Sequence, residues 1–300
     1  MRKKQPCVAR ERKTPFVDIF RTTPPQTVCP NFYVLSHANG CSFQPECSYC
    51  FLKSSFWYLG EPHVFTNLAE MRDEVRAWIA KDDLESYVLN TGNLSDSLVF
   101  EDVRPAIAEL IELFRTEAEA KGRPHSLLLV TKSGTEACRP LLELKPCANV
   151  IMSFSVNDPA AARKHEAGAA PVPDRLDAAR QLQAAGWRVR MRIDPMILGF
   201  DYTSIAEQVR DLAPERVTLG SLRAEHNLPR YVGNGLFAPL EAPARPKGLA
   251  RYPKDQRLAL YRQATAILAG ACPLGLCEET PDIWDALGLD KAAKSCNCGR

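Results

Sequence analysis

The sequence lacks the features of several common protein classes. No stretch approaches the about 18 apolar residues of a membrane-spanning helix, and a formal net charge of +2 demands no nucleic-acid partner. Residues 1–13 are basic and polar, so we expect no signal peptide. We therefore expect a cytoplasmic protein with no membrane partner. In that reducing compartment its eleven cysteines would serve metal binding or redox chemistry rather than disulfides.

Several catalytic motifs are missing as well. The sequence contains no glycine-rich phosphate loop and no recognisable nucleophile triad, and no pair among its five histidines has metal-ligand spacing. A hydrophobic content of 45% with 25% charged residues is ordinary for a soluble protein with a full core. The chain length suits one α/β barrel with extensions. Cysteine is therefore the residue type that carries the chemical information.

Three cysteines lie close together after a short hydrophobic run. Cys41, Cys47 and Cys50 have the spacing C-x5-C-x2-C, which suggests one loop around one metal centre. Thiolates favour iron–sulfur clusters, zinc or copper(I). Three ligands are one fewer than a structural zinc site or an ordinary cluster uses. The missing ligand leaves a metal position at which a substrate or cofactor can bind.

Strand and helix patterns alternate along the middle of the chain. We expect strands at 32–36, 87–89, 127–130, 150–154, 189–193 and 217–219, and helices at 68–79, 103–114, 174–185, 205–212 and 255–268. Such repeats specify right-handed βαβ units. The predicted fold class is α/β, a partial (βα)6 barrel of parallel strands. Residues 1–30 are expected to be an irregular basic, proline-rich arm, residues 31–221 the barrel, and residues 222–300 an irregular C-terminal extension with a helix and a cysteine-rich tail.

Polar side chains follow the predicted strands, where the active site of a parallel βα fold lies. Lys132 and Arg192 carry charges that could hold a carboxylate, and neighbouring hydroxyls and amides suit a ribose or an α-amino group. The residues expected at this mouth are Asn90, Thr91, Asn93, Ser95, Asp96, Thr131, Lys132, Ser133, Ser153, Ser155, Asn157, Arg192, Asp194, Ser221, Arg223 and Glu225.

A set of motifs over about residues 35–200 resembles a known family. They are Gly40-Cys41, Cys47-Ser48-Tyr49-Cys50-Phe51-Leu52, Asn93-Leu94-Ser95-Asp96, Val130-Thr131-Lys132, Phe154-Ser155-Val156-Asn157, Asp174-Arg175-Leu176-Asp177-Ala178-Ala179 and Ala185-Gly186-Trp187. The set is similar to radical S-adenosylmethionine (SAM) enzymes, most closely to their spore photoproduct lyase-like branch. In that family three cysteines hold a 4Fe–4S cluster, and the amino and carboxylate groups of SAM chelate the fourth iron.

The resemblance implies an enzyme, a lyase or a transferase, that cleaves SAM reductively with an electron donor of the flavodoxin or ferredoxin type. Cys41, Cys47 and Cys50 would hold the cluster. By the same resemblance Tyr49 lies near the adenine, and Ser95, Lys132 and Ser155 contact SAM. Arg192 is added to the cofactor-binding residues from its place at a strand end. Glu166 and Arg175 also occupy family-like places, and we expect them to pair.

The sequence departs from the family pattern in two places. The usual first gap of the cluster loop is three residues, whereas here it is five, with Gln44-Pro45 as the extra pair. In the lyase that acts on DNA lesions, a cysteine two residues before the Ser-Asp pair donates hydrogen. Asn93 stands at that place here. We therefore favour a small-molecule substrate, with nucleic acid as the less favoured partner.

Four further cysteines lie near the C-terminus. Cys272, Cys277, Cys296 and Cys298 have the spacing C-x4-C-x18-C-x-C, and they could hold a second cluster or zinc, trap a thiophilic substrate, or pack as free thiols. A trap of this kind suits arsenite, as in the radical enzymes of organoarsenical biosynthesis that move an aminocarboxypropyl group from SAM to arsenic. Cys296 and Cys298 are then candidate catalytic residues.

The other four cysteines, Cys7, Cys29, Cys138 and Cys147, have no ligand-like spacing. We expect Cys138 and Cys147 to pack as small apolar residues.

Three functions therefore compete. The leading one is a radical SAM enzyme whose substrate the sequence leaves open, with aminocarboxypropyl transfer to a thiophilic substrate as one version. The second is repair of a DNA lesion, which needs a basic face and predicts salt-sensitive duplex binding. The third is a zinc-stabilised binding module without catalysis, which would be colourless where a cluster protein is brown.

Overall fold

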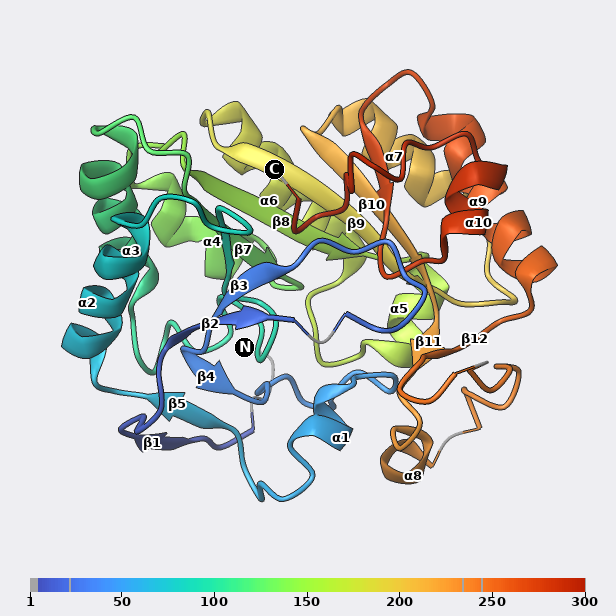
Figure 1. The fold of residues 1–300 in the computed structure, drawn as a ribbon, viewed down its shortest axis with the longest axis horizontal. Coiled ribbons are helices and arrows are strands. Elements are labelled where there is room, and N and C mark those ends of the chain that lie inside the picture. The colour runs from blue at the N-terminus through green and yellow to red at the C-terminus, as the bar shows by residue number, and fades with distance from the viewer. Residues whose placement is uncertain (1–4, 22, 234, 244, 300) are drawn as a thin grey trace.

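The structure, a computed structural model, describes residues 5–21, 23–233, 235–243 and 245–299. Its centre is an eight-stranded sheet of order β13-β10-β9-β8-β7-β6-β3-β2 (Figure 1). Neighbouring strands from β3 to β13 are parallel, and β2 runs antiparallel to β3. The strands are β2 (Val17–Phe20), β3 (Phe32–Leu35), β6 (Val88–Asn90), β7 (Ser126–Thr131), β8 (Val150–Val156), β9 (Arg188–Met196), β10 (Arg216–Ser221) and β13 (Leu274–Leu276). Because β2 and β13 lie at opposite edges, the barrel is partial.

The sheet has two differently covered faces. Side chains alternate along each strand, so Leu127 and Leu129 belong to the large core under the helices, whereas Leu128 and Val130 form a separate small cluster on the other face. We call the second face the inner face. The helices are α2 (Leu68–Ile79), α3 (Ile107–Phe114) continued by η1 (Arg115–Glu119), α4 (Thr135–Leu142), α5 (Pro159–His165), α6 (Val172–Ala184), α7 (Thr203–Leu212), α9 (Lys254–Leu268) and α10 (Pro281–Ala286).

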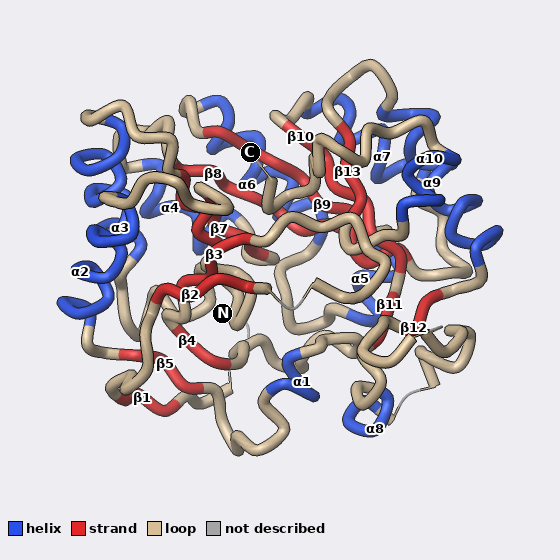
Figure 2. Tube along the Cα trace, in the orientation of Figure 1, coloured by secondary structure: helices blue, strands red, loops and turns tan. Residues whose placement is uncertain are grey.

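Smaller elements surround the loop that follows β3. One sheet of order β1-β5-β4 joins β1 (Val8–Arg10), β5 (His63–Phe65) and β4 (Ala38–Asn39), and another pairs β11 (Arg223–Ala224) with β12 (Ala250–Arg251). Two short helices, α1 (Leu52–Ser55) and α8 (Pro229–Val232), contact each other beside that loop (Figure 1). Figure 2 shows how much of this side of the molecule consists of loops rather than regular elements.

The six predicted parallel strands and the five long predicted helices are present, with shifted ends. The helix expected from residue 103 begins only at Ile107, and Val103 is exposed, because Pro105 restricts the residue before it and lacks an N–H. Asn67 stands at the N-cap of α2, but its side chain bonds Arg12 and Glu70 instead of capping the helix.

The two terminal regions differ more from expectation. The arm is not irregular, because β1 and β2 pair with strands of the body, and Val28 bridges to Glu279. Its residues Arg2, Lys3 and Lys4 lie outside the described part of the chain. The extension contributes β13, a seventh parallel strand. Three residues that include a glycine give too short a hydrophobic run to predict it.

The C-terminal tail, residues 295–299, lies on the inner face of the sheet. Cys298 packs against the inner cluster of Val88, Leu128, Val130 and Ile151. Arg190 of β9 donates to the carbonyl oxygens of Asn297 and Gly299, both at 2.7 Å. In Figure 1 the tail crosses the sheet near β8 and β9. The end of the chain is therefore built into the barrel.

Candidate active site

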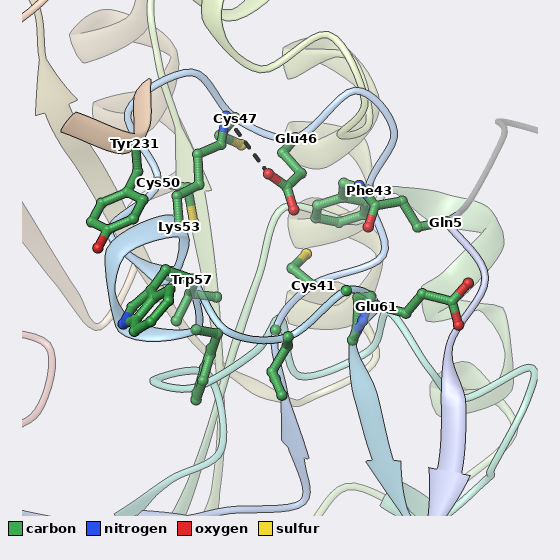
Figure 3. Close-up of a pocket in the computed structure, with 16 residues that line it drawn as sticks. Gln5, Cys41, Phe43, Glu46, Cys47, Cys50, Lys53, Trp57, Glu61 and Tyr231 are labelled. Atoms are coloured by element: carbon green, nitrogen blue, oxygen red, sulfur yellow. Dashed lines mark ion pairs between the residues drawn. The ribbon is translucent and has the colours of Figure 1, made fainter. Parts of the chain in front are cut away.

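The cysteine loop follows β3 and β4 and ends at α1. Its three cysteines border a single cavity of about 310 Å³, and Figure 3 shows Cys41, Cys47 and Cys50 around this space. All three are free thiols. Burial raises the pKa of each, and that of Cys47 to about 12. A metal that displaces these protons would therefore replace neutral thiols with bound thiolates.

The loop is fixed by contacts with a distant part of the chain. Ser48 donates its N–H to the carbonyl oxygen of His165 at 2.9 Å, and its hydroxyl is hydrogen-bonded to His165 Nδ1 at 2.8 Å. Gly168 allows close packing, because a Cβ there would lie 2.2 Å from the carbonyl oxygen of Pro45. The longer first gap of the loop is thus accommodated against the segment between α5 and α6.

A buried ionic network stands behind Tyr49. The Tyr49 hydroxyl donates to Glu166, and Arg175 Nη1 donates to the other Glu166 oxygen at 2.5 Å. The Glu166 and Arg175 side chains are 0% and 1% exposed, so the predicted pair is confirmed as a fully buried one. Burial alone would raise the pKa of Glu166, but the charges of Arg175 and Lys132 outweigh it and lower the pKa. This network fixes the orientation of the loop's aromatic ring.

Lys132, at the end of β7, faces the loop. Its ammonium lies 5.7 Å from the centre of the Tyr49 ring, a cation–π distance. Asp96 sets the backbone here, because its carboxylate accepts from the N–H of Lys132 at 2.7 Å and from the Thr131 hydroxyl at 2.9 Å. The sequence predicted that Asp96 lies at the mouth, but it did not predict that Asp96 positions the backbone of Lys132. The available sequence signal was an acidic residue three positions after the polar turn Asn90-Thr91-Gly92-Asn93.

Ser95 is the clearest sign of an additional ligand. The residue is only 4% exposed, and its hydroxyl has no hydrogen-bond partner in the described part of the chain. Buried polar groups are rarely left without partners. Leu94, the neighbour of Ser95, accepts from the N–H of Gly40, the residue before Cys41, at 2.9 Å, so the orphaned hydroxyl lies in a segment that contacts the cysteine loop and suits a cofactor with polar groups. The residues present therefore fit a cluster with SAM beside it.

The remaining predicted cofactor contacts lie on the inner face of neighbouring strands. Ser155 of β8 is 4% exposed, and it stands beside Arg192 of β9 in the register of the sheet. Arg192 is already engaged: it donates to Asp194 and, at 3.5 Å, to Cys277 Sγ. Its Nε atom has no partner among the described side chains and backbone groups. Arg192 therefore links the predicted SAM mouth to a second set of cysteines.

The second set consists of Cys29, Cys277, Cys296 and Cys298, which we call the inner thiol group. The neighbouring thiols of Cys29 and Cys298 lower the pKa of the Cys296 thiol well below its usual value, and the thiols of Cys296, Cys298 and Cys277 help to raise the pKa of Cys29. Asn90 of β6 donates to Cys298 Sγ at 3.5 Å. These cysteines come from the arm, the segment after β13 and the tail.

The four cysteines of this group are not the four that the sequence spacing grouped together, which included Cys272. Cys272 packs against the main core, and burial alone raises its pKa, to about 11, with no neighbouring thiol contributing. Cys29 takes its place, although nothing in the sequence around Cys29 indicates a ligand. Cys138 and Cys147 are 2% and 1% exposed within the core, as expected for small apolar residues.

Neither cysteine set is arranged around a single ion. Within the described ranges, no three histidine, cysteine, aspartate or glutamate side chains are close enough to hold one metal ion together. For the loop this spacing fits a cluster, in which three thiolates bind three different irons, better than it fits one zinc ion. None of the described helices is both long and apolar enough to cross a membrane.

Comparison with known proteins agrees with this geometry. The model of the spore photoproduct lyase family matches residues 9–220. Solved structures of spore photoproduct lyase superpose well. One is a complex with dinucleoside spore photoproduct (TM-score 0.74, 17% identity, 90% of this chain and 82% of that chain). Another is a variant with bound AdoMet and the same dinucleoside (TM-score 0.71, 17% identity, 89% and 81%).

At this level of identity the structures show a shared fold. No curated protein matches the chain in sequence. The family match, however, covers well over half of the chain. The 4Fe–4S cluster and SAM predicted from the sequence are the cofactors of that family. The chain therefore belongs to the spore photoproduct lyase family of radical SAM enzymes.

Proposed function

We propose that this enzyme cleaves SAM reductively at a 4Fe–4S cluster held by Cys41, Cys47 and Cys50, and that it modifies a small molecule on the inner face of the barrel. When bound, the cluster and SAM supply a carbon radical. The protein's own residues bind, orient and shield the reactants. The observation that carries the small-molecule choice is the tail, residues 295–299, which covers part of the inner face through contacts with Arg190 and the Val88 cluster.

The proposed roles follow from the contacts. Lys132, positioned by Asp96, offers a charge to the SAM carboxylate, and the orphaned Ser95 hydroxyl offers a hydrogen bond. Tyr49, fixed by Glu166, presents its ring beside Lys132 for the adenine. Ser155 lies between these residues and Arg192. The eleven cysteines all lie in the described part of the chain and form no disulfide, which suits the reducing cytoplasm where a flavodoxin- or ferredoxin-type donor would be found.

The test uses anaerobically reconstituted protein, chemical reduction and SAM. We expect brown protein with about four irons per cluster and cleavage of SAM that depends on the reductant. Release of 5′-deoxyadenosine would identify the ordinary radical, and release of methylthioadenosine would identify cleavage on the aminocarboxypropyl side. Colourless protein that carries zinc and leaves SAM intact would overturn the proposal in favour of a zinc-stabilised module.

Transfer of the aminocarboxypropyl group to a thiophilic substrate such as arsenite is the second candidate. It is favoured by Cys298, which lies on the inner face and accepts from Asn90, and by Cys296; the charge of Arg192 lowers the pKa of Cys296 and opposes the rise in the pKa of Cys298. In this candidate the two cysteines hold the acceptor. A Cys296→Ser, Cys298→Ser double variant should lose the transfer product. Full product formation by that variant would exclude the role.

Repair of a DNA lesion is the alternative closest to the structural relatives, one of which is complexed with dinucleoside spore photoproduct. Asn93 supplies no thiol where the resemblance implies a hydrogen donor. Duplex binding that weakens steeply with salt, together with repair of a lesion-containing oligonucleotide, would favour this function over ours.

A further inference from the structure

A second cavity, of about 250 Å³, lies at the opposite end of the sheet from the cysteine loop. Four of its lining residues stand at or next to the first residues of β6, β7, β8 and β9, namely Val88, Ser126, Ile151 and Arg188. The cysteine loop instead follows the carboxyl end of β3. In the described part of the chain the two cavities share no lining residue, so the second is a separate site.

The register of the sheet places these side chains on the inner face. Val88 is the register partner of Ser126, and Ile151 is the register partner of Arg188. Val88 and Ile151 belong to the small cluster on the inner face, so Ser126 and Arg188 face the same way. Arg190, two residues further along β9, also lines the cavity. The floor of the cavity therefore crosses four strands on the face that carries the tail.

The lining of this cavity carries more positive than negative charge. Its three arginines are Arg123, Arg188 and Arg190. Arg188 and Arg190 share one carboxylate, that of Glu215, at 2.7 and 2.8 Å. Arg123 pairs with Asp82 at 3.1 Å, but the Asp82 side chain is 78% exposed, so solvent weakens that pair. Among the described residues, three guanidinium groups are thus paired with two carboxylates, one of them in solvent.

The arginines are held in place by the fold and still have N–H groups to offer. Arg190 is 1% exposed, and its Nη1 holds the tail through two carbonyl oxygens. Arg123 uses Nε and Nη2 to bind the carbonyl oxygens of Ile79 and Lys81, which leaves Nη1 for a ligand. Ser126 adds a hydroxyl to the lining. A buried cationic group that lacks a full counter-charge is costly, and a bound anion would offset that cost.

We propose that this cavity binds one small oxyanion, the carboxylate or phosphate group of a small molecule, through Arg123, Arg188 and Ser126. The planar guanidinium group presents N–H donors that match the oxygens of both anions. The apolar part of the lining, which includes Val88 and Ile151, leaves room for a small organic body. The bound anion also compensates the charge of Arg190 and so supports the tail that Arg190 holds. The site is independent of the proposed reaction at the cysteine loop.

The test is calorimetric titration of anaerobic holoenzyme with inorganic phosphate and, separately, with succinate. Ionic strength is held constant with chloride, and saturating SAM without reductant keeps the proposed cofactor site filled. We expect one saturable site per chain for at least one of the two anions. Arg123→Gln should weaken binding about fivefold or more, since it removes a charged hydrogen bond. Arg123→Lys loses the same guanidinium contacts but keeps the charge, so it should bind more tightly than Arg123→Gln. Arg180→Gln is the matched control, an exposed arginine of α6 paired with Asp177.

Each outcome bears on the site directly. Wild-type protein that shows no saturable binding of either anion would overturn the proposal, and so would an equal loss of affinity in Arg180→Gln and Arg123→Gln. Binding of phosphate without succinate would identify the ligand group as a phosphate, and the reverse would identify a carboxylate. Hydrogen exchange at residues 295–299 should slow when the anion is bound. Unchanged exchange there, with the anion bound, would overturn the link to the tail. Thermal melting of each variant shows that it is folded.

Discussion

The two cysteine groups of this protein are built in opposite ways. Cys41, Cys47 and Cys50 belong to one loop that follows β3, and they border one cavity. The inner thiol group joins the arm, the segment after β13 and the tail. Local spacing reveals the first group and conceals the second, because a loop brings its own residues together while a distant pair meets only through the fold. The two groups should therefore respond independently to substitution.

The largest effect is expected at the loop group. Cys50→Ser removes one of the three proposed cluster ligands, so iron content after reconstitution should fall by most of its value. Reductive SAM cleavage should then decrease by at least a hundredfold. Iron analysis and chromatography of the SAM products measure both. Cys29→Ser should keep its iron. Equal iron loss in the two variants would show that both groups serve one metal centre.

How much of each cysteine group could be predicted from the sequence depends on how far apart in the sequence its contacting residues lie. The loop, the six strands and the Glu166–Arg175 pair could be predicted because motifs and hydrophobic runs are local signals. Cys29 could not, since its neighbours follow from pairing of the arm with Glu279. The same limit explains the missed strand β13 and the mistaken assignment of the arm as irregular. Cys272 was grouped with the tail cysteines by proximity in sequence, whereas the fold places it against the core.

The ionic supports of the two groups should differ in strength. Glu166 and Arg175, behind the loop, are 0% and 1% exposed, whereas Glu278 and Arg223, beside Cys277, are 24% and 16% exposed. Glu166→Gln leaves a buried guanidinium without its counter-charge, and we expect a loss of about 3–5 kcal/mol in unfolding free energy. For Glu278→Gln we expect about 1 kcal/mol or less. Urea denaturation measures both.

One outcome would contradict the expected order of the two losses in unfolding free energy. Equal losses in Glu166→Gln and Glu278→Gln would mean that burial of the pair does not set its contribution. Iron content in Glu166→Gln should also fall, because Glu166 fixes Tyr49 within the loop. Glu278→Gln should leave iron unchanged.

Acid should lower the stability of the segment that leads from β3 to the cysteine loop. His37, which follows β3, is buried; its Nε2–H donates to the Thr91 carbonyl oxygen, and its Nδ1 accepts from Arg104. Burial and the Arg104 charge lower the pKa of His37 to about 3. The unfolded chain protonates near pH 6.5, so it binds more protons than the folded chain below that pH. Stability is full above about pH 6.5 and falls by at most about 1.4 kcal/mol per pH unit toward pH 3.

His37→Gln isolates this contribution. Glutamine keeps a donor and an acceptor but does not titrate, so the pH slope of unfolding free energy between about pH 4 and 6.5 should decrease. His226→Gln is the control, because it makes the same replacement at an exposed histidine. An unchanged slope in His37→Gln would assign the acid sensitivity to other groups.

The smallest effect should appear at two serines that lie two residues apart. Ser97 Oγ is hydrogen-bonded to Thr91 Oγ1 at 2.6 Å and accepts from the N–H of Val130 at 2.8 Å, whereas Ser95 Oγ has no partner in the described chain. Ser97→Ala should therefore lower unfolding free energy by about 1–2 kcal/mol and leave SAM affinity nearly unchanged. Ser95→Ala should leave stability equal or slightly higher, since it removes a hydroxyl that the fold does not satisfy. It should weaken SAM binding about 3–10-fold, the value of one hydrogen bond. Calorimetric titration of reconstituted protein with SAM distinguishes the two variants. If Ser95→Ala bound SAM as tightly as the wild type, its unpartnered hydroxyl would no longer mark the cofactor site beside the loop group.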